Sequence, residues 1–142
     1  MTNRQKRLVQ DSFSRIAPAA DTAASLFLTR LRELDPQFRN VAPGDVAEQS
    51  RKLIDIVAMT VKGLDRFEDL VPDLEQFGSR YDSYRIIDER YEAVASAMTW
   101  TLGTLLGPAF NCDVREAWYA AYHLVCSVMR NGSREEELAA TT

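Results

Sequence analysis

Few residues in this chain have side chains suited to chemistry at neutral pH. The sequence contains one histidine, His123, and two cysteines, Cys112 and Cys126. A metal site built from several imidazoles is therefore excluded, and the two thiols form neither a CxxC pair nor another metal-binding spacing. If both cysteines lie on one helix they are ~21 Å apart, too far for a disulfide. We predict a surface histidine and two reduced, structural thiols.

Sequence motifs of several enzyme classes are absent. The chain has no GxGxxG, no GxxxxGK[ST] and no GxSxG pattern. Its acidic groups, such as Asp69 with Asp73 and residues 135–137, fall on charged stretches, which are typical of solvated helix faces. The residue inventory alone predicts a soluble all-helical domain with a small-ligand core, and we do not expect an enzyme.

Length and composition favour one soluble domain. The 142 residues are 46% hydrophobic and 27% charged, enough for a single buried core. A net charge of −4 and a pI near 5.0 argue against a nucleic-acid partner, which would need a basic surface. No apolar run approaches the roughly 20 residues that span a bilayer, and the first residues do not have the pattern of a signal peptide. We predict a cytoplasmic protein with neither a nucleic-acid nor a membrane partner.

The elements that must position any site are all helical. Apolar residues recur at helical spacing over residues 3–17 and 20–34, and Asp35-Pro36 ends the second segment. A short helical turn is predicted over 37–41. Asp45 is a typical N-cap for a helix that runs to Lys62. The stretch 65–84 is less regular and contains Pro72.

Two long helices complete the predicted all-α fold. An apolar stripe begins near Asp88, includes Tyr91 and ends at Gly107-Pro108. Asn111 is a typical cap for a last helix, and Asn131-Gly132 is a typical end for it. No segment shows the alternation of a strand. We therefore predict one all-α domain over residues 1–132 and a polar C-terminal tail over 133–142.

Three stretches resemble globins, specifically bacterial single-domain globins and the globin part of flavohaemoglobins. The first covers residues 5–36 and includes Leu26-Phe27-Leu28-Thr29-Arg30-Leu31. The second is Glu48-Gln49-Ser50-Arg51-Lys52-Leu53, which is similar to the globin distal helix. The third runs from Leu106-Gly107-Pro108-Ala109-Phe110 to Tyr122. The resemblance covers about residues 5–130 and implies a globin fold, in which haem lies between the distal helix and the helix that ends near Tyr81.

The resemblance also implies which residues line that pocket. Phe77-Gly78-Ser79-Arg80-Tyr81 fills the family pattern Leu-Gly-x-Arg-His, with Tyr91 ten residues later, so Tyr81 takes the place of the iron ligand. Ala42 replaces the phenylalanine that wedges against haem, and Leu28 replaces a distal tyrosine or phenylalanine. The family's distal amide and apolar wall are matched by Gln49 and Leu53. The predicted cofactor-binding residues are thus Leu28, Ala42, Gln49, Leu53, Tyr81 and Tyr91, and Tyr81 is the metal ligand if haem is bound.

Two functions follow from these replacements. In the first, the chain is a globin-like sensor or binding protein for a small apolar or diatomic ligand, with haem held weakly or not at all. In the alternative, it is a haem-binding globin with a Tyr81-ligated ferric iron, handling oxygen, nitric oxide or redox signals; a phenolate favours ferric iron. A simpler interpretation is that Tyr81 is an ordinary buried tyrosine. A protein partner, a homodimer and the physiological ligand are left open.

Overall fold

Helices account for nearly all of the chain that the structure describes. The computed structural model describes the backbone of residues 1–36, 46–79 and 91–141, and side chains within residues 1–36, 54–76 and 91–130. The helices are α1 (Asn3–Ile16), α2 (Ala20–Leu34), α4 (Val46–Lys62), α5 (Phe67–Ser79), α7 (Tyr91–Leu106) and α8 (Cys112–Thr141). Short 3₁₀ turns cover Ala17–Ala19, Leu64–Arg66 and Gly107–Ala109. No strand occurs within these ranges, and the predicted all-α class is confirmed.

Local capping explains where several helices begin and end. Thr2 and Gln5 form a capping box at the start of α1, in which each side chain accepts a hydrogen bond from the other residue's backbone N–H at 3.0 Å. The predicted cap of the last helix is confirmed, because the Val114 N–H donates to Asn111 Oδ1 at 3.0 Å. Gly107 has a φ of +57°, a left-handed conformation that suits glycine where the chain leaves α7. The predicted turn over 37–41 lies outside the described residues.

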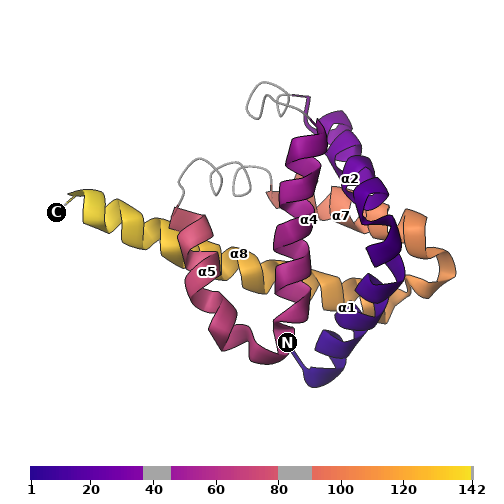
Figure 1. The fold of residues 1–142 in the computed structure, drawn as a ribbon, viewed down its shortest axis with the longest axis horizontal. Helices are drawn as coiled ribbons and strands as arrows, with labels where there is room; N and C mark the ends of the chain where they lie inside the picture. The colour runs from indigo at the N-terminus through magenta and orange to yellow at the C-terminus, as the bar shows by residue number, and fades with distance from the viewer. Residues whose placement is uncertain (37–45, 80–90, 142) are drawn as a thin grey trace.

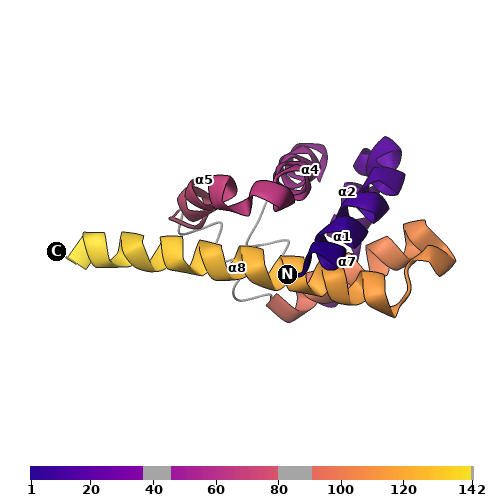
Figure 2. The ribbon, with the colours of Figure 1, turned by 90° about the horizontal axis from the view of Figure 1, so that it is seen from below.

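The end of the last helix differs from the prediction. Asn131-Gly132 was predicted to stop it, but α8 continues through these residues to Thr141. An interior glycine costs a helix only about 1 kcal/mol relative to alanine, so the local stop signal is a preference that a continuing helix can override. Figures 1 and 2 show that the C-terminal end of α8 extends beyond the other described helices. The domain boundary at residue 132 stays a prediction.

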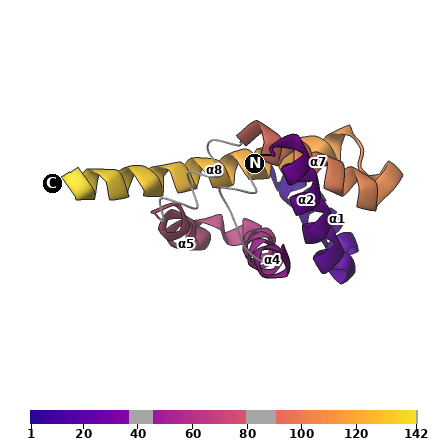
Figure 3. The same cartoon turned by 90° about the horizontal axis from the view of Figure 1, so that it is seen from above.

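The long helix α8 organises the arrangement of the others. α1 and α5 pack against different parts of it, and α2 packs against both α7 and α4. Figure 1 shows α4 crossing over α8, and Figure 3, seen from above, shows α4 and α5 on one side of α8. Among the described helices, none combines the length and the apolar character needed to cross a membrane.

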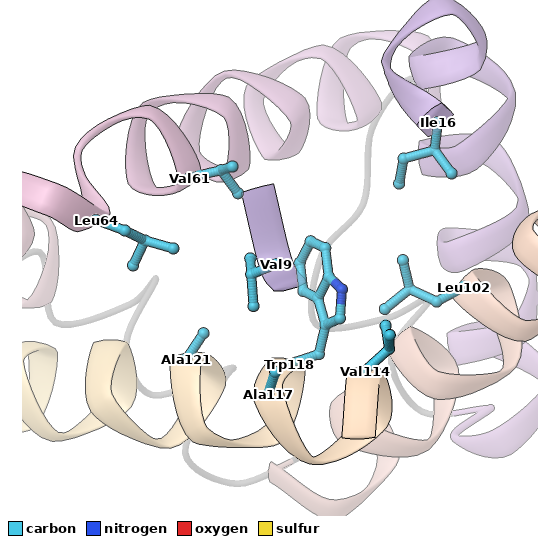
Figure 4. Packing of buried hydrophobic residues seen from close by; sticks show 9 residues of the cluster. All are labelled: Val9, Ile16, Val61, Leu64, Leu102, Val114, Ala117, Trp118 and Ala121. Atoms are coloured by element: carbon cyan, nitrogen blue, oxygen red, sulfur yellow. The ribbon is translucent and has the colours of Figure 1, made fainter. Parts of the chain in front are cut away.

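The main core lies where α1, α4, α7 and α8 meet, around the indole of Trp118. Figure 4 shows this ring beside Val9 and Leu102. Val61 and Leu64 lie on the side of the cluster away from Leu102. The indole Nε1–H donates a 2.8 Å hydrogen bond to Ser12 Oγ, and the Ser12 hydroxyl donates to the carbonyl oxygen of Leu8. The polar atoms that α1 and α8 bury at this point are therefore paired, as buried polar groups must be.

Substitution of Ser12 tests this buried pair. Ser12→Ala leaves the buried Trp118 N–H without its acceptor, so we expect the free energy of unfolding to fall by about 1–3 kcal/mol in urea titrations. Ser14→Ala is the matched control on the same helix, because Ser14 is exposed and its hydroxyl donates to the Asp11 carbonyl oxygen. Equal effects of the two substitutions would contradict a structural role for the Trp118–Ser12 bond.

We expect the substitution of glycine by alanine to have opposite effects on the free energy of unfolding at two positions. A Cβ on Gly63 would lie 2.6 Å from Leu70 Cδ1 and 2.7 Å from Leu70 Cγ. Because this contact is too close, we expect Gly63→Ala to lower the free energy of unfolding by about 1–3 kcal/mol. A Cβ on Gly103, inside α7, would meet Phe110 at an ordinary 3.5 Å. Gly103→Ala should therefore raise the free energy of unfolding by about 0.4–1 kcal/mol, because alanine reduces the conformational entropy of the unfolded chain. Thermal unfolding of both variants checks the difference in sign.

Candidate functional site

Most of the predicted pocket residues have side chains outside what the structure describes. Ala42 and Tyr81 fall outside the described ranges. Gln49 and Leu53 lie within α4, which places their backbone, but their side chains are not among those described. Leu28 on α2 and Tyr91 at the start of α7 are described in full. The geometry of the site is therefore built from these two positions and from the residues around them.

Leu28 belongs to a packed cluster between α2 and α7. Its side chain is 5% exposed and lies with buried Leu31 and Ala97. Partly buried Phe27, Ala93 and Val94 pack against the same cluster. Because this position joins two helices, a leucine here contributes to the fold whatever ligand is bound.

Tyr91 ties the first turn of α7 to the middle of α8. Its phenol oxygen lies 3.2 Å from His123 Nδ1, and its backbone carbonyl oxygen accepts a 3.0 Å hydrogen bond from the Tyr122 hydroxyl. The Tyr91 and Tyr122 rings stack with centroids 4.8 Å apart at 30°. Cys126 and Met129 are buried against them. We call Tyr91, Tyr122, His123 and Cys126 the tyrosine–histidine cluster.

Burial controls the ionisation of the two phenols. Desolvation raises the pKa of Tyr122 far above its ordinary value, and the neighbouring Cys126 adds to the rise. Desolvation also raises the pKa of Tyr91; Cys126 and Glu92 add to this effect, whereas Arg130 opposes it. Both phenols are therefore protonated at neutral pH.

The sole histidine is not placed as an enclosed metal ligand. His123 is exposed on α8, as predicted, and its Nδ1 is within hydrogen-bond distance of Tyr91. In the part of the chain that the structure describes, no group of three or more His, Cys, Asp or Glu side chains could hold a metal ion. The two cysteines are not joined in a disulfide; Cys112 is exposed and Cys126 is buried. The described residues therefore hold no donor cluster for a bare metal ion, and Tyr81, the predicted iron ligand, lies outside them.

Residues 122, 123 and 126 were not predicted as part of a site. Tyr122 was assigned to the family's last-helix pattern, and His123 was predicted to be a surface residue and not a catalytic base. Their contact with Tyr91 joins positions 31 and 32 residues apart. The available signal in the sequence is the pair of adjacent polar aromatic residues at 122–123, which carries no indication of the partner across the helices.

Leu28→Ala tests whether this position is packed core or the wall of an open pocket. Because the Leu28 side chain is buried between two helices, its truncation leaves a cavity. We expect this to lower the free energy of unfolding by about 2–5 kcal/mol. Leu34→Ala is the control at the end of the same helix, where the leucine is 41% exposed. If urea unfolding shows the two variants equally stable, Leu28 is not a core residue.

Comparisons with known proteins agree with this fold. The family model described as Globin matches residues 30–129. Neuroglobin from Danio rerio is 24% identical over 146 residues, covering 93% of this chain and 92% of the relative. A flavohemoprotein from Vibrio cholerae is 24% identical over 131 residues, covering 90% of this chain; the chain spans 33% of that protein's length.

A solved structure shows the same fold. The crystal structure of a hexacoordinated heme protein from an anhydrobiotic tardigrade superposes with a TM-score of 0.80 and 17% sequence identity. The match covers 94% of this chain and 96% of the other. With the helices and their packing described above, and a family model matched over most of its length, this chain belongs to the globin family.

Proposed function

We propose that this globin is a binding or sensor protein for a small ligand, and that it holds haem weakly or not at all. The observation that carries the proposal is the position of its only histidine. His123 is exposed and bonded to Tyr91, so no described imidazole is left to act as an enclosed iron ligand. Without a strong axial bond, haem depends on apolar contacts alone for its retention.

Two replacements in the family pattern support the same conclusion. Tyr81 stands where the pattern has the ligating histidine, and Ala42 stands where it has the wedging phenylalanine. Losing a large apolar ring from a packed site typically costs about 3–5 kcal/mol. The remaining matched residues, Gln49 and Leu53, would give a pocket with an amide donor and an apolar wall. Such a pocket suits a small apolar or diatomic ligand, and signalling would then pass through a protein partner or a second copy of the chain.

A second candidate function is supported by the comparisons, which include a flavohemoprotein and a hexacoordinated heme protein. Here haem is held by the Tyr81 phenolate, with Gln49 on the distal side. A phenolate axial ligand favours ferric iron, and haem so bound would supply redox or gas-handling chemistry and not reversible oxygen storage. In both candidates the chain is a binding protein and not an enzyme, and it acts in the cytoplasm.

Hemin titration of the purified chain separates the two candidates. We expect weak, non-saturating uptake and an absorption spectrum that Tyr81→Phe leaves unchanged, because no strong axial ligand is present. A stoichiometric Soret band that shifts in Tyr81→Phe would replace the first candidate with the second. His123→Gln is measured in parallel. If saturable uptake disappears in that variant, the exposed histidine is the ligand and both candidates are wrong.

A further inference from the structure

The three tyrosines with described side chains differ in the chemistry of their hydrogen-bond partners. The Tyr122 hydroxyl donates to a backbone carbonyl oxygen, that of Tyr91, at 3.0 Å. The Tyr119 hydroxyl lies 3.3 Å from the Thr99 hydroxyl. The Tyr91 hydroxyl lies 3.2 Å from an imidazole nitrogen, His123 Nδ1. Among these three phenols, only Tyr91 is paired with an imidazole nitrogen.

This difference decides which phenol is easily oxidised. A phenol that loses one electron becomes strongly acidic and must also lose its proton. A carbonyl or hydroxyl oxygen is a poor proton acceptor, whereas a neutral imidazole accepts the proton readily. In the neutral tautomer that carries its hydrogen on Nε2, Nδ1 of His123 is that acceptor. The pairing therefore makes Tyr91 the favoured site of one-electron oxidation among the described tyrosines.

We propose that Tyr91 is a redox-active tyrosine that gives one electron to an outer-sphere oxidant while its phenol proton passes to His123. The O–H bond of Tyr91 breaks and an N–H bond forms at Nδ1. The oxidant, a high-potential one-electron metal complex or radical, is reduced by one electron. The products are a neutral phenoxyl radical and an imidazolium, so charge and atoms balance.

The surroundings of the pair suit this step. Burial raises the pKa of Tyr91, so the phenol stays protonated and its oxidation needs a proton acceptor. His123 is exposed, which lets the transferred proton exchange with water. Tyr91 is only partly buried, so a soluble oxidant can approach its ring. The Tyr122 ring stacks on it, and the buried thiol of Cys126 lies in the same cluster. None of these features requires a bound cofactor, so the inference is independent of whether haem is held.

Freeze-quench electron paramagnetic resonance of the haem-free full chain tests the proposal. The probe is hexachloroiridate(IV), and the readout is the initial rate of tyrosyl radical formation at pH 7. His123→Gln removes the only imidazole in the chain while keeping a polar side chain. We expect it to slow the Tyr91-dependent radical about tenfold. This is less than the roughly 100-fold typical of a positioned base, because water competes at an exposed pair.

Two further variants assign the radical. Tyr91→Phe should remove most of the early signal. Tyr119→Phe is the matched control, since that exposed phenol is paired with a hydroxyl, and it should leave the rate unchanged. Circular dichroism checks that each variant is folded, and if Tyr91→Phe fails to fold, His123→Gln alone decides. An unchanged rate in His123→Gln, or an equal loss in Tyr119→Phe, overturns the proposal.

Discussion

The hydrogen bond between the Trp118 indole and the Ser12 hydroxyl lies at the centre of this structure. It joins the first and last helices through two buried side chains that are 106 residues apart in the sequence. Burying the indole N–H there without an acceptor would be costly, and the apolar residues of four helices surround the ring. This contact therefore helps to fix the position of α8 relative to α1.

The candidate site depends on the same helix. Tyr122 follows Trp118 by four residues, so one face of α8 supplies first the core and then the contact with Tyr91. His123 comes next in sequence and points to the exposed side, yet it still reaches the Tyr91 hydroxyl. The packing that fixes the globin fold thus also places an imidazole beside a phenol. The residues that build this core are different from the residue predicted to ligate iron. The fold therefore does not by itself decide whether the chain binds a cofactor.

Much of the fold followed from local patterns. The start of α8 at Asn111 and the close of α7 at Gly107 were predicted from capping and glycine preferences, and both are confirmed. The end of α8 was missed because Asn131-Gly132 signals a preference of only about 1 kcal/mol. Of the predicted site, Leu28 lies in the α2–α7 core cluster, and Tyr91 reaches His123. The placement of Tyr81, Ala42, Gln49 and Leu53 as pocket residues stays a prediction.

The sequence by itself determined most of the helical segments, their apolar faces and the presence of only one histidine, because each is a property of composition or of near neighbours in the chain. The tertiary structure decided what those faces meet. The approach of His123 to Tyr91 depends on how α7 and α8 rotate and cross, which is set by the packing of the whole core. Helical periodicity shows which residues share one face of a helix. It does not show which residue of another helix, 32 positions away, will lie opposite.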